Sequence, residues 1–138
     1  MKKVLILLII APVILFVVPD CGSKGGGGGG GGNDEANLVI TLNPPANSTQ
    51  PAAPQVDFPL TVSITSAMPP QGVTIDVKAA PDGSTTNFFT ESRSSTSAIN
   101  NFTITNTPVG PVCVVTVTVT SKTKATNTVT ASYRYSRK

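Results

Sequence analysis

The side chains able to carry chemistry in this chain are two cysteines and a few scattered acids. The sequence has no histidine, which is the commonest general base and a frequent metal ligand at neutral pH. The acids beyond residue 20 lie in separate segments: Asp34, Glu35, Asp57, Asp76, Asp82 and Glu91. Catalytic acids need neighbours that shift their pKa values, and this spacing supplies none. We therefore predict a non-catalytic protein with no catalytic residues, no cofactor and no metal.

Two pairs of these acids are the best candidates for a site. Asp57 and Asp76 would form a glycosidase-like carboxylate pair only if the fold brought them together. Both fall on the predicted outward faces of strands, so we expect solvated charges. Asp82 and Glu91 are too few to supply the six or more oxygen ligands of calcium.

Cys113 falls on the apolar side of a predicted strand, among alternating valines. A thiol away from positive charge is inert and packs as a small hydrophobe. With no histidine to activate it, Cys113 is predicted to be a core residue and not a nucleophile. Cys21 lies apart, near the N-terminal apolar run.

The N-terminal residues have the composition of an export signal. Lys2 and Lys3 form a short positive region, and Val4 to Val18 is a run of fifteen residues that are all apolar apart from the neutral Pro12. This length suits a secretory signal and is shorter than the roughly 20 residues that span a bilayer. We predict a signal segment over residues 1–20, helical in its apolar part.

With Cys21 directly behind this segment, the N-terminus resembles a bacterial lipoprotein precursor. In that family the cysteine after the apolar run is acylated and becomes the new N-terminus, which implies lipidation of Cys21 and a membrane anchor in the cell envelope, at the outer membrane. Val18 fits the cleavage motif, whereas Asp20 stands where the family prefers a small residue. Two alternatives stay open: an uncleaved apolar anchor, and simple secretion.

Eight consecutive glycines, Gly25 to Gly32, follow the cysteine. Glycine has no side chain to bury and loses the most backbone freedom on ordering, so we predict a disordered spacer over residues 21–35. Its glycines would span about 15 Å as a flexible coil. A phosphate-binding loop would need a preceding strand and a following helix, and neither is predicted.

Residues 36–138 show the two-residue alternation of β-strands. Valine and threonine dominate this region, and both suit a pleated, half-buried surface. No helical period of ten or more residues occurs outside the signal. Strands are predicted at 38–42, 56–65, 73–80, 87–91, around Phe102 and Ile104, at 113–120 and at 128–135. Residues 92–97 are predicted to be a loop.

The alternation also predicts which side chains face the core. The inward set comprises Val56, Phe58, Leu60, Val62, Ile64, Val73, Ile75, Val77, Ala79, Cys113, Val115, Val117, Val119, Val129, Ala131, Tyr133 and Tyr135. If the last strand were shifted by one residue, both tyrosines would be exposed and available to sugar rings; we expect them inside.

About seven strands at this spacing, without a helix, predict a single antiparallel β-sandwich. The layout resembles immunoglobulin-like and fibronectin type III domains over residues 36–138. The chain has no tryptophan and no cysteine on the 56–65 strand to pair with Cys113, and Pro111 stands where the antibody-type tyrosine would be. A fibronectin-like member without a disulfide therefore fits better.

The net charge argues against nucleic acid as a partner. The whole chain carries +3, and removing Lys2, Lys3 and Asp20 leaves +2. The basic residues near the C-terminus lack the interleaved aromatics of a nucleic-acid surface. We predict a surface-displayed structural or interaction module with an unidentified protein or glycan partner. The alternative is a lipoprotein that binds carbohydrate or another ligand, which exposed aromatic side chains would favour.

Overall fold

The alternating segments form strands throughout the part of the chain that the structure describes. The structure is a computed structural model, and it describes residues 35–138. Its seven strands are β1 (Ile40–Asn43), β2 (Phe58–Ile64), β3 (Val73–Pro81), β4 (Phe89–Ser95), β5 (Ile99–Ile104), β6 (Val112–Ser121) and β7 (Thr128–Ser136), and residues 35–138 contain no helix. The predicted signal segment and glycine spacer, Glu35 excepted, lie outside the described residues.

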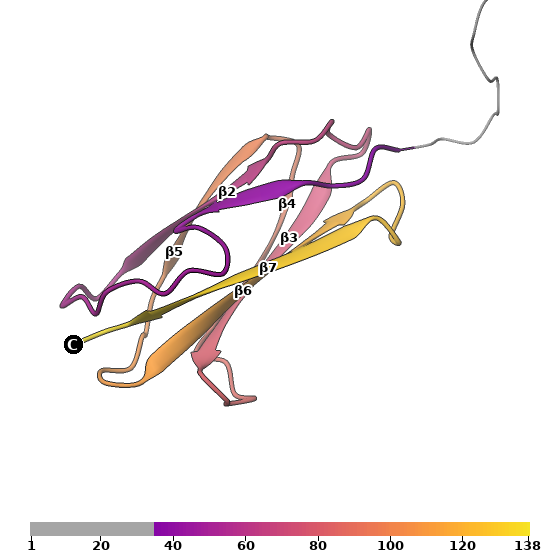
Figure 1. The fold of residues 1–138 in the computed structure, drawn as a ribbon. Helices are drawn as coiled ribbons and strands as arrows, with labels where there is room; N and C mark the ends of the chain where they lie inside the picture. The colour runs from indigo at the N-terminus through magenta and orange to yellow at the C-terminus, as the bar shows by residue number, and fades with distance from the viewer. Residues whose placement is uncertain (1–34) are drawn as a thin grey trace, which may run out of the picture. The chain divides into compact units, whose positions relative to one another are not determined.

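The strands form two antiparallel sheets, as the sequence predicted (Figure 1). One sheet has the order β1-β2-β5, and the other has the order β4-β3-β6-β7. Side chains from both sheets join in one hydrophobic cluster between them. Most strands thus bury one face and leave the other to solvent, which gives a β-sandwich-like arrangement. The edge strand β4 is the exception, since none of its side chains is fully buried.

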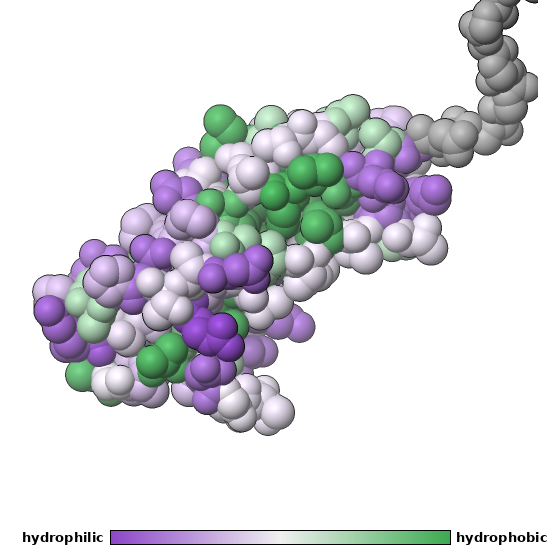
Figure 2. All heavy atoms as spheres, viewed as in Figure 1, coloured by the Kyte–Doolittle hydropathy of each residue, from purple (hydrophilic) through white to green (hydrophobic). Residues whose placement is uncertain are grey.

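The alternation identified most of this core correctly. The inward-facing apolar side chains of β2, β3 and β6 are buried, and Val77 and Val117 are fully so. They are Phe58, Leu60, Val62, Ile64, Val73, Ile75, Val77, Ala79, Cys113, Val115, Val117 and Val119. Burying one such side chain stabilises the folded state by about 1.5–3 kcal/mol before the entropic cost of ordering it. Val129 and Ala131 are half-buried at the margin of the cluster. In Figure 2 the hydrophobic side chains visible on one face gather near β1.

The prediction that Val56 lies in a strand and faces the core was wrong. Val56 is 54% exposed and lies before β2. The segment ahead of it, Asn47 to Ala53, runs beside β7 of the other sheet. The chain must then cross to β2, whose pairing with β5 begins at Phe58 opposite Ile104. Residues 54–57 form this crossing, so the alternation of the strand does not extend back to Val56.

The prediction was also wrong for residues 92–95, which we assigned to a loop. They belong to β4, which pairs with β3 as far as Val73 opposite Ser95. β4 is an edge strand with mostly exposed side chains, so its position depends on backbone hydrogen bonds and needs no apolar alternation. Arg93 reaches from β4 to the other sheet, where its guanidinium lies 4.4 Å from the ring centroid of Phe102 and donates to the Asn101 carbonyl.

The proline-rich connection between β1 and β2 covers the free edge of β7. Isolated parallel bridges join Thr49 to Arg134 and Ala53 to Arg137. The backbone N–H of Gln50 donates to the Arg134 carbonyl at 2.8 Å, and that of Arg134 donates to the Ser48 carbonyl at 2.8 Å. An exposed strand edge invites pairing with other chains, and this segment occupies the edge of β7.

The start of the described chain is fixed to the turn between β6 and β7. The amide of Asn127 donates to the Ala36 carbonyl at 2.9 Å, and its oxygen accepts from the Leu38 N–H at 2.9 Å. The carboxylate of Glu35 accepts hydrogen bonds from Asn127 and from the Ser121 hydroxyl. The chain therefore enters the two-sheet domain at the end where this turn lies.

We expect a fragment beginning at Asn33 to fold by itself. All seven strands, the core and the Asn127 contacts lie within residues 35–138. Such a fragment should give a β-type circular dichroism spectrum and one cooperative thermal transition. A fragment that starts at Val39, and so lacks the partners of Asn127, should unfold at a lower temperature. A non-cooperative transition of the longer fragment would contradict the prediction.

Candidate functional site

Cys21, the predicted lipidation site, lies outside the described residues. Cys113 is a free thiol with no exposed surface, as predicted, and its sulfur lies 3.7 Å from the Pro111 carbonyl oxygen. Burial raises the pKa of the Cys113 thiol. A protonated, enclosed thiol is a poor nucleophile, so Cys113 serves the core.

The structure does not bring the candidate acid pairs together. Asp57 is exposed just ahead of β2, whereas Asp76 lies on β3 of the other sheet. Asp82 accepts a hydrogen bond from Arg134 at 3.1 Å, and Glu91 pairs with Arg93. Within residues 35–138 no three His, Cys, Asp or Glu side chains form a group able to hold a metal ion.

The two tyrosines face the core, so the register predicted for the last strand is confirmed. Tyr133 is 2% exposed and Tyr135 is 1% exposed. The Tyr135 hydroxyl lies 2.7 Å from the Thr107 hydroxyl. Burial raises the pKa of both phenols, that of Tyr135 to about 12. Neither ring is placed for stacking on a sugar at the surface.

Hydroxyls cover the outer face of the four-stranded sheet. Thr118 of β6 lies 3.1 Å from Thr130 of β7, oxygen to oxygen, and Thr120 lies 3.0 Å from Thr128. Each pair is directly opposite in the register of the two strands. Cross-strand threonine pairs of this kind stabilise a sheet and present a polar surface to solvent.

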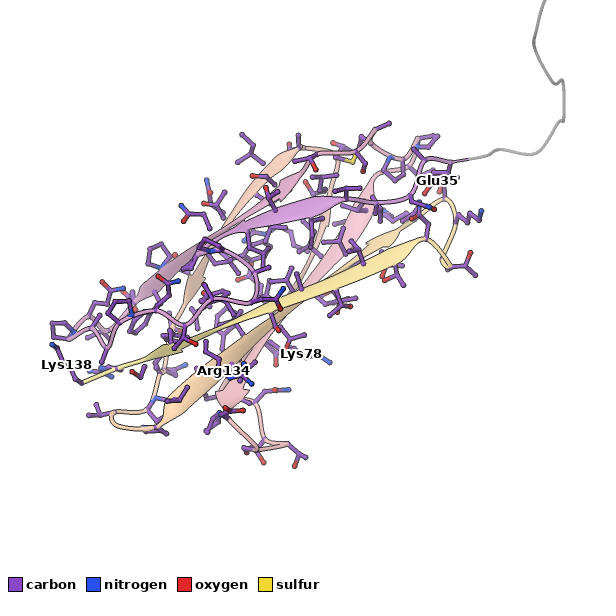
Figure 3. The ribbon with its side chains drawn as sticks, in the orientation of Figure 1. Glu35, Lys78, Arg134 and Lys138 are labelled. Carbon is purple, nitrogen blue, oxygen red and sulfur yellow. The ribbon has the colours of Figure 1, made fainter. Side chains whose placement is uncertain are left out.

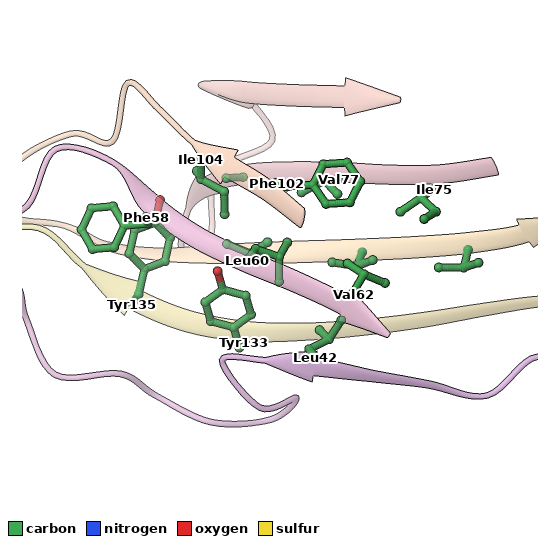
Figure 4. Packing of buried hydrophobic residues seen from close by; sticks show 14 of the residues in the cluster. Leu42, Phe58, Leu60, Val62, Ile75, Val77, Phe102, Ile104, Tyr133 and Tyr135 are labelled. Carbon is green, nitrogen blue, oxygen red and sulfur yellow. The ribbon is translucent and has the colours of Figure 1, made fainter. Parts of the chain in front are cut away.

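A mainly apolar pocket of about 370 Å³ lies between the proline-rich connection and the ends of β2 and β7. Its walls carry no charged side chain: they are Pro44, Gln50, Pro51, Ala52, Ala53, Pro54, Gln55, Phe58, Pro59, Tyr133 and Tyr135. Figure 4 shows Phe58 of β2 against Tyr135 of β7, with Tyr133 beside them. The ring centroids of Phe58 and Tyr135 are 4.4 Å apart.

A second recess of about 360 Å³ lies beside the turn between β3 and β4. Its lining mixes polar and apolar groups, with Lys78 and Thr116 on its sheet side and Asp82 on the turn. The Arg134 guanidinium already pairs with Asp82, and both groups are about half exposed. Figure 3 shows Lys78 and Arg134 in this part of the domain. An exposed ion pair of this kind contributes little binding energy.

No pattern in the amino-acid sequence predicted the apolar pocket. It forms because residues 47–53 pair with β7, more than 80 positions further along the chain. Alternation within one strand does not reveal a parallel pairing between distant segments. The prolines and alanines between Pro44 and Pro54 indicate an irregular connection and not a binding site.

Comparison with protein-family models, with curated proteins and with solved structures finds no match for this chain. Within residues 35–138 no helix is long and apolar enough to cross a membrane.

Proposed function

We propose that this chain is a non-catalytic envelope lipoprotein, anchored through Cys21, that displays a fibronectin type III-like domain as a structural or interaction module. The signal-like run before Cys21 and the glycines behind it support the anchor and the spacer. The strand order of the four-stranded sheet, β4-β3-β6-β7, supports a fibronectin type III-like domain over a constant-type immunoglobulin domain. In the latter the fourth strand joins the sheet of the first, second and fifth strands, whereas β4 pairs with β3 here.

The observation that carries the proposal is the placement of the two ends of the domain. Glu35, where the chain leaves the predicted spacer, is hydrogen-bonded at the turn between β6 and β7. Lys138 lies at the opposite end of the domain (Figure 3). A tether at Glu35 would hold one end near the membrane and present the other end, with the proline-rich connection, away from it.

The surface favours an interaction module over a carbohydrate-binding one. Sugar rings stack on exposed aromatic faces, and Phe58, Phe102, Tyr133 and Tyr135 are all buried. Phe88 and Phe89 are half-buried against the core. The broad outer face of the four-stranded sheet carries hydroxyls instead.

Display can be tested with an epitope placed after Lys138. We expect antibody to label intact cells that produce the tagged full-length chain, because the tag would project from the end opposite the tether. A periplasmic protein with the same tag is the control and should be labelled only after permeabilisation. Labelling of the chain only after permeabilisation would rule out surface display.

A further inference from the structure

The two sheets have four edge strands, and three of these edges are short or covered: those of β1, β5 and β7. Residues 47–53 pair with β7. β1 has four residues and is followed by Pro44 and Pro45, which have no N–H to donate to another strand. On β5 the Asn101 carbonyl accepts a hydrogen bond from the Arg93 guanidinium at 3.0 Å. Within residues 35–138, β4 is therefore the edge strand that nothing covers.

The pairing of β3 shows which backbone groups lie along the free edge of β4. In an antiparallel sheet, successive residues of a strand direct their N–H and C=O groups to opposite sides. Gly72 accepts from the Lys122 N–H at 3.0 Å, and the Asp82 N–H donates to Val112 at 2.8 Å, so even-numbered residues of β3 face β6. Odd-numbered residues therefore face β4, and their partners there are Phe89, Glu91, Arg93 and Ser95.

The remaining residues of β4 direct their backbone groups away from the sheet. These residues are Thr90, Ser92 and Ser94, and the side chains of all three are exposed. β4 is seven residues long and contains no proline. An edge strand of this kind can pair with a strand of another chain.

The charges on β4 indicate which strand would fit. Glu91 and Arg93 flank Ser92 and lie on the same face of the strand. An antiparallel copy of β4 centred on Ser92 would place Glu91 of each copy opposite Arg93 of the other, and opposite charges directly across a pair of strands stabilise it. Moving the centre to Glu91 or to Arg93 would place like charges opposite each other. β4 is thus complementary to itself in one register.

We propose that β4 pairs with β4 of a second copy of this chain, antiparallel and centred on Ser92, so that the two four-stranded sheets become continuous. The backbone groups fit the same register as the charges: Ser92 would face Ser92, and Thr90 would face Ser94, so all three outward-directed residues would gain partners. A two-fold axis at Ser92 would repeat every contact. The proposal names a partner for the interaction module and rests on that part of the proposed function.

Cysteine cross-linking tests the register in the full chain, purified in detergent micelles. In Ser92→Cys the two Cα atoms would be about 5.5 Å apart, which a disulfide can bridge. Ser94→Cys is the matched control, because it lies on the same edge but would be about 14 Å from its counterpart along the strands. With copper-phenanthroline as oxidant, Ser92→Cys should form disulfide-linked dimers at least about tenfold faster than Ser94→Cys. The unaltered chain gives the background from Cys21 and Cys113.

Equal cross-linking rates for Ser92→Cys and Ser94→Cys would overturn the proposed register. No cross-linking of Ser92→Cys above the background would overturn the pairing itself and would leave this edge to a different protein or to solvent.

Charge reversal tests the two ion pairs and is carried out in the Ser92→Cys chain. Glu91→Arg places arginine opposite arginine and should slow cross-linking about tenfold, and Arg93→Glu should do the same. A mixture of the two variants should recover cross-linking, because each chain then meets the opposite charges of the other. Within either variant residues 91 and 93 carry like charges, so the recovery cannot come from an ion pair inside one chain.

An unchanged rate in Glu91→Arg, or no recovery in the mixture, would overturn the role of the charges. Circular dichroism would establish that each variant is folded. Glu91→Arg keeps the contacts of Arg93 with β5, so it remains informative even where Arg93→Glu fails to fold. Cross-linking in micelles requires neither fatty-acyl labelling nor surface display, so the pairing and the proposed anchor can fail separately.

Discussion

Replacing Cys113 with aspartate should abolish cooperative folding of the domain at neutral pH. The side chain has no exposed surface, and its neighbours across the strands, Pro81 and Tyr135, carry no positive charge. An unpaired carboxylate enclosed by apolar groups costs several kcal/mol, which is comparable with the whole stability of a small domain, about 5–15 kcal/mol. Urea denaturation followed by circular dichroism would measure the loss.

The effect of Cys113→Asp should depend on pH in a defined direction. Burial raises the pKa of a carboxyl, so the folded domain tolerates the protonated form and excludes the charged one. The loss relative to the unaltered chain should be smallest below about pH 3.9, the ordinary pKa of aspartate, and should grow as the pH rises above it. A loss of stability independent of pH would point to shape and not to charge.

Two control variants separate burial from other effects at this position. Cys113→Ala removes only the sulfur and should cost about 1 kcal/mol. Val114→Asp places the same charge on the next residue, which faces outward opposite Arg134, and should remain folded. If Cys113→Asp were as stable as Val114→Asp, the assigned register of β6 would be wrong. Rapid reaction of the native thiol with a bulky reagent would contradict its burial as well.

The sequence determined the core because alternation is a local property of each strand. Cys113, Val115 and Val117 could be assigned to one face from their spacing alone, and the structure buries all three. The same reasoning located Tyr133 and Tyr135, because a shift of one residue would have exposed the whole valine and tyrosine set. These predictions needed no knowledge of which strands are neighbours.

Features that depend on distant pairing could not be predicted in this way. Around Ser94 and Ser95 the chain is polar on both faces of the sheet, so no apolar alternation marks a strand there. These residues belong to β4 because β3 supplies backbone hydrogen bonds beside them. Val56 continues the alternation of β2 in sequence, yet the crossing between sheets exposes it. The apolar pocket has the same origin, since Ala53 reaches its wall through pairing with Arg137.

The second large effect is expected at the anchor, where Cys21→Ser should abolish fatty-acyl labelling. Only the thiol at this position, directly behind the apolar run, matches the lipoprotein pattern. Cells fed an alkyne-bearing fatty acid would be compared for the unaltered chain and the variant. The folded domain should be unaffected, because residues 35–138 contain the whole described core.

Cys113→Ala is the matched control for this experiment, because the chain has only these two cysteines. It should retain full labelling, since the buried Cys113 thiol offers no access to an acylating enzyme. Labelling that persists in Cys21→Ser would remove the lipoprotein proposal, and so would the absence of labelling in the unaltered chain.

If the unaltered chain is not labelled, its location decides between the two alternatives. An unlabelled chain that stays with the membrane at its uncleaved mass would identify the apolar run as the anchor. An unlabelled chain recovered in the medium would indicate secretion, and Asp20→Ala would then show whether the acid before Cys21 had blocked acylation.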